Sequence, residues 1–316
     1  MKLQILINPQ CKGAYFSDVL DVACAELRCV YPDLDIEILV QGSASFLLVD
    51  LPIEECSKII RLSFVQCIFE FCDGNFLRIL ATHPNFLIPE EIVFGNKYKG
   101  KTNELVTQLA INLGLHYAPH VEGKKTKILD PMAGRGTTLL WAARYGIDAV
   151  GIEKNPDALE HFCRHVKKQC KLHHIKHKYT KGNIGKKNKD GVGAFHAVEW
   201  EHSKNTLIVA DSSNLSPNII SERFHVIVTD IPYGIQFLGK NNQRNPLQLI
   251  EDCAVSWADR LYAEGIIVII YNALQPKRNE LTDIFVKIGL EVLPFSAPHR
   301  MSESIKRDVL VLKKMN

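Results

Sequence analysis

Residues 127–139 read KILDPMAGRGTTL, and this stretch decides the fold. Its beginning predicts a buried strand over Lys127–Leu129, directly before Asp130, and the residues from Gly136 predict a helix. The backbone N–H groups and the dipole at the start of such a helix attract anions. Gly134 and Gly136 permit the backbone to approach a ligand closely. The stretch therefore predicts a ligand-binding loop between a strand and a helix.

The polar character of this loop discriminates between two cofactors. A dinucleotide-binding loop requires a third glycine three residues after the second, and Leu139 stands at that position. Asp130 would repel a pyrophosphate but attracts a ligand that carries an ammonium group. S-adenosylmethionine carries both an ammonium and a carboxylate, so the loop favours this cofactor over NAD. For the glycine motif alone, a simple turn between strand and helix is the alternative.

Two further predicted strands end in acids. Glu153 closes the strand Ala149–Ile152 and lies 17 residues after Gly136, where a carboxylate can accept hydrogen bonds from both ribose hydroxyls. Asp211 and Ser212 follow the strand Leu207–Ala210, where they can reach an adenine amino group. Taken alone, Glu153 is more simply a solvated acid at a strand end, and Asp211 with Ser212 has an Asx turn as its alternative. Open α/β sheets bind ligands at the carboxyl ends of their strands, so the three strand ends together predict a cofactor pocket.

A fourth predicted strand, Val226–Thr229, runs into Asp230-Ile231-Pro232-Tyr233. There an aromatic ring can stack on a nucleobase, and a carboxylate with nearby backbone carbonyls can hold an exocyclic amino group. Holding the amine directs its nitrogen lone pair toward a sulfonium methyl group, so positioning supplies most of the catalysis. For this motif alone, an ordinary loop after a strand is the alternative.

The elements around these motifs predict an α/β fold with two domains. Beyond Lys101 strands alternate with helices, which is typical of a parallel, doubly wound sheet. Residues 1–90 mix short strands and helices and predict a small α+β domain, and Thr82–Asn96 is the predicted linker to a second domain over 96–316. In the first domain, strands are predicted over Leu3–Ile7, Ile36–Val40, Ser45–Leu51 and Phe64–Phe71, and helices over Phe16–Leu27 and Pro52–Leu62. In the second, helices are predicted over Thr102–Leu115, Gly136–Tyr145, Pro156–Cys170, Leu247–Leu261 and Glu280–Ile288, and further strands over Ile266–Ile270 and Arg307–Lys313.

The composition of the 316 residues is that of an ordinary globular protein, with 46% hydrophobic and 23% charged residues. No apolar run is long enough for a membrane helix, and the first residues do not resemble a signal peptide. The nine cysteines form no CxxC pair, which predicts buried thiols in a reducing compartment, and therefore a cytoplasmic protein without a membrane partner.

Charge is distributed unevenly along the chain. Residues 1–90 carry 6 basic and 12 acidic residues, a net charge of −6, and the remainder carries 32 and 23, a net charge of +9. Residues 164–189 contain ten Lys or Arg and four His without an acid. This run has two equal interpretations, a solvated loop or an arm that binds nucleic acid phosphates through Lys186, Lys187 and Lys189. Its histidines lack the carboxylate or Cys/His pattern of a zinc site, so no metal is predicted.

The motifs Asp130–Thr137 and Asp230–Gly234 resemble the first and fourth motifs of class I methyltransferases that modify amino groups of nucleic acids. The closer resemblance, over residues 96–316, is to THUMP-associated RNA methylases, which include tRNA guanosine N2-methyltransferases. In that family a segment corresponding to Tyr98–Asn103 packs over the methionine part of the cofactor. The family pattern at the fourth strand is Asp/Asn-Pro-Pro-Tyr/Phe, and Ile231 replaces its first proline. Residues 1–90 resemble the N-terminal domain of the tRNA enzymes only loosely.

The resemblance implies a Rossmann-like seven-stranded methyltransferase sheet, S-adenosyl-L-methionine as cofactor and an N-terminal domain that positions RNA. It also implies methyl transfer to an exocyclic base nitrogen, with guanine N2 in tRNA as the expected target. Adenine N6 in DNA or RNA is the alternative, and a non-catalytic RNA-binding protein on a methylase fold is an alternative of another class. An activating protein subunit is not identified. The predicted catalytic residues are Asp230, Ile231, Pro232 and Tyr233. The predicted cofactor-binding residues are Thr102, Asn103, Asp130, Met132, Ala133, Gly134, Gly136, Thr137, Glu153, Lys154, Asp211 and Ser212.

Overall fold

The computed structural model describes residues 1–72, 76–96, 101–185, 191–232 and 246–316, and it divides into two compact units. The small unit comprises Met1–Asn85 and Phe295–Asp308, and the large unit comprises Phe86–Pro294 and Val309–Asn316. The division expected from the sequence assigned all residues after 96 to one domain, whereas the structure groups Phe295–Asp308 with the N-terminal residues. The functional roles of the two regions stay a prediction.

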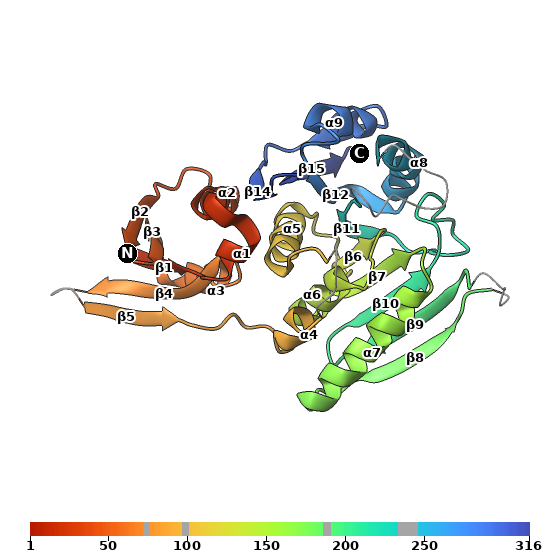
Figure 1. Cartoon of the computed structure of the whole chain (residues 1–316), viewed down its shortest axis with the longest axis horizontal. Helices are drawn as coiled ribbons and strands as arrows, with labels where there is room; N and C mark the ends of the chain where they lie inside the picture. The colour runs from red at the N-terminus through yellow and green to blue at the C-terminus, as the bar shows by residue number, and fades with distance from the viewer. Residues whose placement is uncertain (73–75, 97–100, 186–190, 233–245) are drawn as a thin grey trace. The chain divides into compact units, whose positions relative to one another are not determined.

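The small unit is built on an antiparallel sheet with the strand order β2-β3-β1-β4-β5 among the described residues (Figure 1). Its strands are β1 (Lys2–Ile7), β2 (Glu37–Gln41), β3 (Ala44–Asp50), β4 (Val65–Cys72) and β5 (Phe76–Ala81). Its helices are α1 (Cys11–Tyr15), α2 (Val19–Val30) and α3 (Cys56–Ile59), with 3-10 turns at Phe16–Asp18 and Ile53–Glu55. Ile5, Leu47 and Ile68 are paired across three strands and are fully buried. The four predicted strands are confirmed, whereas β5 and α1 were not predicted.

The C-terminal segment of the small unit packs against its N-terminal helices. The His299 ring, which is fully buried, meets the Tyr15 ring edge-on with a centroid distance of 5.0 Å. The Arg300 backbone N–H donates to the Asp18 carboxylate at 2.8 Å. These contacts join residues more than 280 positions apart, so sequence proximity gave no indication of this grouping.

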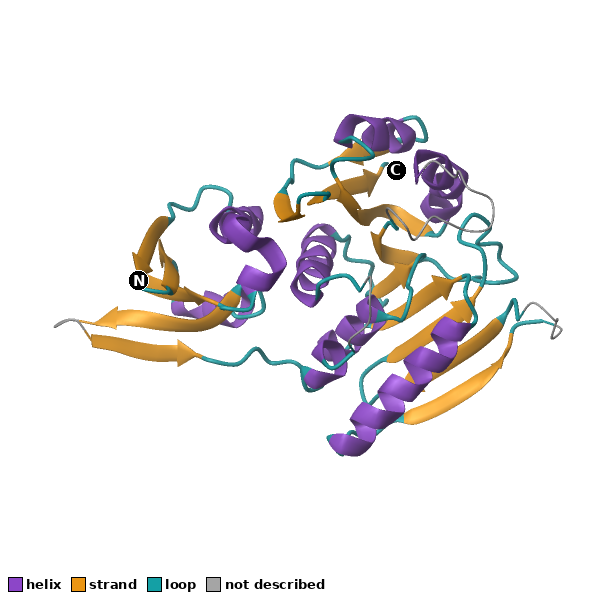
Figure 2. Cartoon of the chain, viewed as in Figure 1, coloured by secondary structure: helices purple, strands orange, loops and turns teal. Residues whose placement is uncertain are grey.

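The large unit is a mixed sheet with helices on both faces, as Figure 2 shows, and this confirms the predicted α/β fold class. Among the described residues its strand order is β13-β15-β12-β11-β6-β7-β10-β9-β8, and β14 pairs with β15. The strands of this sheet are β6 (Lys127–Asp130), β7 (Asp148–Glu153), β8 (Lys178–Asn183), β9 (Ala194–Glu199), β10 (Lys204–Val209), β11 (Phe224–Asp230), β12 (Leu261–Asn272), β13 (Leu290–Val292), β14 (His299–Ser302) and β15 (Ile305–Lys314). Of these, β14 and the first four residues of β15 are grouped with the small unit. Strands β10, β7, β6, β11 and β12 are parallel neighbours, which is the arrangement that alternating strands and helices predict.

Burial on both faces explains the continuous apolar strands at the centre of this sheet. The helices are α4 (Glu91–Phe94), α5 (Glu104–Tyr117), α6 (Thr137–Tyr145), α7 (Asp157–Leu172), α8 (Pro246–Asp259) and α9 (Arg278–Val286). Ile227 of β11 and Ile267 of β12 share one core cluster with Trp257 of α8 and Phe285 of α9. Helices α5, α6 and α7 contact β10, β11 and β12 directly. None of the helices in the described ranges has the length and apolar character that a membrane span needs.

The sheet is wider than the seven strands that the resemblance implies, because the hairpin β8–β9 extends it beyond β10. The basic run in this region was interpreted as a loop or an arm, but α7 continues to Leu172 and β8 occupies Lys178–Asn183. Strand β8 is the edge of the sheet and carries exposed lysines, so the apolar alternation that would have predicted a strand is absent.

Candidate active site

Four strands of the large unit bring acids to one edge of the sheet. Strands β11, β6, β7 and β10 are consecutive neighbours, and their carboxyl ends carry Asp230, Asp130, Glu153 and Asp211. Paired residues place these ends at the same level, since Asp130 pairs with Gly151 and Glu153 pairs with Val209. The structure thus brings together acids that lie up to 100 residues apart in the sequence.

The loop after β6 has the geometry of a close backbone approach. Gly134 and Gly136 have positive φ angles of 52° and 81°, a region that favours glycine. A Cβ on Gly134 would meet no atom within 4 Å, whereas a Cβ on Gly136 would lie 2.8 Å from the Phe162 ring. Gly136 is therefore required by packing, and Gly134 leaves open space above the loop. The Ala133 N–H donates to the Ile152 carbonyl at 2.8 Å and fixes the loop on β7.

Asp130 is almost fully buried at the base of this loop. Burial raises the pKa of its carboxyl to about 7, against the hydrogen bonds from the Thr138 hydroxyl and the Met132 N–H, which favour the charged form. The Met132 N–H lies 3.1 Å from Asp130 Oδ1. The carboxylate is held in a low-dielectric site, and no cation of the described part of the chain contributes to its pKa, so it is suited to a positively charged ligand. Thr137, beside Thr138, is the first residue of α6 and is also buried.

Glu153 is fixed by two backbone N–H groups. Its Oε2 accepts from the Gly134 N–H at 3.0 Å, and its Oε1 accepts from the Asn155 N–H at 2.8 Å. The carboxylate therefore faces the glycine loop rather than open solvent. Each carboxylate oxygen has a second lone pair, so the hydroxyl groups of a ligand can donate to Glu153 at this position.

At the end of β10 the geometry is that of an Asx turn. Asp211 Oδ1 accepts from the N–H and the hydroxyl of Ser213, at 3.0 and 2.8 Å, and Lys154 Nζ lies 2.8 Å from Oδ2. Burial alone would raise the pKa of Asp211, but the hydrogen bonds from Lys154 and Ser213 lower it to about 2. Ser212 accepts the Trp257 indole N–H at 2.9 Å, so its hydroxyl anchors α8.

Asp230 at the end of β11 accepts a hydrogen bond from the Thr102 hydroxyl, 128 residues away in the sequence. Ile231 is buried, and its N–H donates to the Ile270 carbonyl at 3.0 Å. A proline at this position has no N–H, so Ile231 extends the pairing of β11 with β12 by one residue. Pro232 follows, and Tyr233 lies outside the described residues, as do Tyr98–Gly100 and the predicted phosphate-binding Lys186, Lys187 and Lys189.

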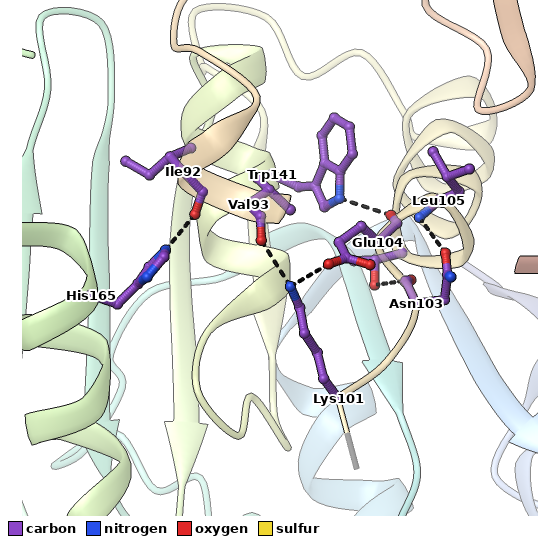
Figure 3. A network of polar contacts seen from close by, with 9 residues as sticks. Ile92, Val93, Lys101, Asn103, Glu104, Leu105, Trp141 and His165 are labelled. Carbon is purple, nitrogen blue, oxygen red and sulfur yellow. Dashed lines mark hydrogen bonds and ion pairs between the residues drawn. The ribbon is translucent and has the colours of Figure 1, made fainter. Parts of the chain in front are cut away.

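Figure 3 shows how the segment that carries Thr102 is held. Lys101 Nζ lies 2.8 Å from the Val93 carbonyl and 2.5 Å from Glu104 Oε1, and this lysine side chain is only 8% exposed. The Trp141 indole N–H donates to the Glu104 carbonyl at 2.8 Å. Asn103 is the N-cap of α5, because its side-chain oxygen accepts from the Leu105 N–H at 2.9 Å. The network holds the segment that carries Thr102 through the Val93 carbonyl of α4, Glu104 of α5 and the Trp141 side chain of α6.

The sequence did not single out Lys101 or Gly151. A Cβ on Gly151 would lie 2.7 Å from Ala133 Cβ and 2.7 Å from Leu139 Cδ1, so glycine permits the loop and α6 to pack closely on β7. The signal for Gly151 was present, because a glycine inside an apolar strand often marks a close approach. No comparable signal existed for Lys101, since its partners become neighbours only in the folded chain.

The chemistry of this edge fits S-adenosylmethionine. The cofactor carries an ammonium, a sulfonium, a ribose diol and an adenine amino group, all of which a carboxylate attracts or accepts from. Asp130, Glu153 and Asp211 provide carboxylates at three neighbouring strand ends, and the open space above Gly134 admits a ligand. A pyrophosphate would meet three acids in the same place, which is unfavourable for a dinucleotide.

The fold and the chemistry of this edge define an S-adenosylmethionine-dependent methyltransferase. Residues 109–283, more than half of the chain, match the model of the RMKL-like methyltransferase domain family, and the chain belongs to that family. No curated protein matches the chain in sequence.

Solved structures with a similar fold are methyltransferases of low sequence identity. TrmN from Thermus thermophilus is 14% identical with a TM-score of 0.48, and the match covers 89% of this chain and 60% of TrmN. A methyltransferase from Pyrococcus furiosus is 13% identical with a TM-score of 0.43, and the match covers 72% of this chain and 93% of the Pyrococcus chain. SMU.1697c from Streptococcus mutans, solved in complex with SAH, is 12% identical with a TM-score of 0.40, and the match covers 65% of this chain and 98% of SMU.1697c. This chain therefore spans less than two thirds of the length of TrmN.

Proposed function

We propose that the protein transfers a methyl group from S-adenosylmethionine to an exocyclic amino group of a nucleobase in RNA, with guanine N2 in tRNA as the target. The observation that carries this proposal is the position of Asp230, which ends β11 beside β6 and its glycine loop and is oriented by Thr102. S-adenosylmethionine supplies an electrophilic methyl group when it is bound at this edge.

The residues at the end of β11 can hold the amine for this reaction. The Asp230 carboxylate accepts a hydrogen bond from the exocyclic NH2, and the Ile231 and Pro232 carbonyls are further acceptors in the same segment. The Ile231 N–H already donates to the Ile270 carbonyl, so it is not available to a base, and the segment offers a base its acceptors. In the proposal Tyr233 stacks on the base, and the amine loses its proton to solvent during or after transfer.

Charge and resemblance support RNA as the substrate. The residues after 90 carry a net charge of +9, which favours a polyanion. The motifs around Asp130 and Asp230 resemble those of RNA methylases that modify amino groups, and the tRNA enzymes are the closer match. Adenine N6 methylation keeps the same site and differs only in the base. A non-catalytic RNA-binding protein is disfavoured by the chemistry retained at Asp230 and in the glycine loop.

We place the protein in the cytoplasm, where such a substrate is available. All nine cysteines are free thiols in the structure, and Cys11, Cys170 and Cys253 are among the most deeply buried. Burial raises the pKa of the Cys170 thiol to about 11, so the group stays protonated and unreactive.

The test is methyl incorporation into defined nucleic acids. The protein is incubated with methyl-labelled S-adenosylmethionine and, separately, unmodified tRNA and double-stranded DNA. The proposal predicts label in the tRNA and none in the DNA. Label confined to DNA would overturn the substrate, and absence of label from both would overturn the reaction.

A further inference from the structure

Helix α7 carries a row of cations on its solvent-facing side. Arg164, Lys167, Lys168 and Lys171 recur at the spacings i, i+3, i+4 and i+7, which places them on one helix face, and all four are exposed. The opposite face contains Phe162, Val166 and Cys170, which are buried. Among the described residues, no acid forms an ion pair with any of the four cations.

The composition of this row is unfavourable for the helix itself. Neighbouring members carry the same charge at a spacing of i,i+3 or i,i+4, and each such pair destabilises a helix. On an ordinary solvated helix face, positive and negative side chains alternate. The helix dipole favours a cation in the last turn and so explains Lys171, but its effect does not extend to Arg164 or Lys167. The acids of α7, Asp157 and Glu160, lie in its first turn. A bound anion would offset the repulsion within the row.

The neighbouring strand β8 continues the basic surface. Lys167 Nζ lies 4.3 Å from the centroid of the Tyr179 ring, so the row and the strand are in contact. Lys181, two residues further along β8, lies on the same face as Tyr179 and is exposed. The adjacent His196 ring lies 3.8 Å from the Glu160 carboxylate, and burial lowers its pKa, with Glu160 opposing the decrease and Lys181 and Lys167 adding to it. Lys178, by contrast, is 3.5 Å from Glu199 and is neutralised.

The row leads away from the reaction edge, and Arg164 is its nearest member along the helix. Helix α7 begins at Asp157, shortly after Glu153 at the end of β7, and runs away from that edge over the face of β9 and β10 (Figure 1). At 1.5 Å per residue, Arg164 lies about 10 Å and Lys171 about 21 Å along the helix from its start. A backbone that leaves the reaction edge along α7 would therefore meet the four cations in succession.

We propose that this α7–β8 surface, formed by Arg164, Lys167, Lys168, Lys171 and Lys181, binds the phosphates of the RNA that flank the target nucleotide. The inference rests on the proposed function for its substrate. The surface would position RNA and would take no part in methyl transfer, because none of the five residues lies at the carboxyl ends of β11, β6, β7 and β10. Sequence-independent phosphate contacts set the register of a substrate and make its affinity dependent on salt.

The test compares two variants with the same change in net charge. The first carries Lys167→Gln, Lys168→Gln and Lys171→Gln. The matched control carries Lys12→Gln, Lys125→Gln and Lys287→Gln, which are exposed and belong to neither α7 nor β8. The Kd for unmodified tRNA is measured against salt concentration for both variants and for the wild-type chain, together with KM and kcat for methyl transfer.

We expect the α7 variant to lose about two or three units of salt slope and to bind tRNA at least about tenfold more weakly at low salt. Its KM for tRNA rises, whereas kcat at saturating tRNA and the affinity for S-adenosylmethionine stay unchanged. The control retains the wild-type slope. Equal slopes for the two variants, with the wild-type chain active on tRNA, would overturn this inference alone. A wild-type chain that neither binds nor methylates tRNA would overturn the proposed function and this inference with it.

Discussion

The carboxyl edge of the large sheet and the α7–β8 surface carry opposite charge in opposite settings. At the edge, Asp130, Glu153, Asp211 and Asp230 stand at the ends of neighbouring strands, and Asp130 is buried deeply enough to change its pKa. On α7 and β8 the charges are basic, exposed and spread over two elements. We infer different roles from this difference. In the proposed reaction the fixed acids hold a small cationic cofactor and an amine, and the distributed bases hold a long anion without reading its sequence.

The largest effect is expected at Asp230. Asp230→Ala removes the carboxylate that orients the amine, so methyl transfer should fall by about a thousandfold. Binding of S-adenosylmethionine should change little, because the proposal assigns Asp230 to the base and not to the cofactor. Single-turnover transfer and calorimetry measure the two quantities separately. Unaltered single-turnover transfer in Asp230→Ala would remove the catalytic role from this loop.

Thr102→Val provides the finer version of the same test. The valine keeps the shape of the side chain and removes the hydroxyl that donates to Asp230. Transfer should fall by about tenfold, less than in Asp230→Ala, because the carboxylate remains but loses a partner that orients it. Rescue of the rate by Thr102→Ser is the expected control, and a rate unaffected by Thr102→Val would show that this hydrogen bond does not position Asp230.

The next effect concerns the cofactor side of the edge. S-adenosylmethionine should bind with micromolar affinity, about −8 kcal/mol, and Gly134→Val should weaken this by about a hundredfold because its side chain enters the open space above the loop. Gly123→Val is the matched control, since Gly123 also has a positive φ and no atom within 4 Å of a Cβ. Both variants should lose similar stability. Equal loss of cofactor affinity in both would contradict the position of the pocket.

On the substrate side, Tyr233→Ala should weaken RNA binding by about 1–3 kcal/mol, the value typical of a stacked base. Tyr233→Phe retains the ring and should bind RNA as the wild-type chain does. Fluorescence anisotropy with labelled tRNA measures both. If the two variants bind equally well, the aromatic ring does not contact the base.

The smallest effect is a stability gain at Asp130. Its pKa of about 7 lies above the unfolded value of about 3.9, so the protonated carboxyl is favoured in the folded state. The stabilisation is complete below about pH 4 and is lost as the pH rises through 7. Asp130→Asn mimics the protonated form and should raise the unfolding free energy of the cofactor-free chain by about 1–2 kcal/mol at pH 8, with no gain near pH 4. Thermal unfolding at the two pH values checks this, and a variant less stable than the wild-type chain at pH 8 would contradict it.

The sequence predicted the centre of the large sheet because its strands are buried on both faces. The apolar run Val226–Val228 lies inside β11 and the run Ile266–Ile270 lies inside β12, and every residue of the two runs is buried. Strand β8 was not predicted for the opposite reason. It is an edge strand, and it carries the exposed Lys178 and Lys181 where a predictable strand would show alternating apolar residues.

The same distinction holds within the site. Acids at strand ends were found because chain direction alone brings the carboxyl ends of parallel strands together. The hydrogen bond between Thr102 and Asp230, and the Lys101 network that supports it, depend on the packing of α4, α5 and α6. Long-range side-chain contacts of this kind leave no periodic signal in a sequence. The hydrogen bond from the Trp257 indole N–H to the Ser212 hydroxyl could not be predicted for the same reason.

The identity of the methylated atom tests the central claim most directly. Unmodified tRNA is incubated with the full-length chain and methyl-labelled S-adenosylmethionine, digested to nucleosides and analysed by mass spectrometry. The account predicts a methyl group on an exocyclic nitrogen, specifically N2-methylguanosine, which is absent when Asp230→Ala replaces the wild-type chain. A methyl group on a ribose oxygen or a ring carbon would contradict it, because Asp230 would then have no amine to orient.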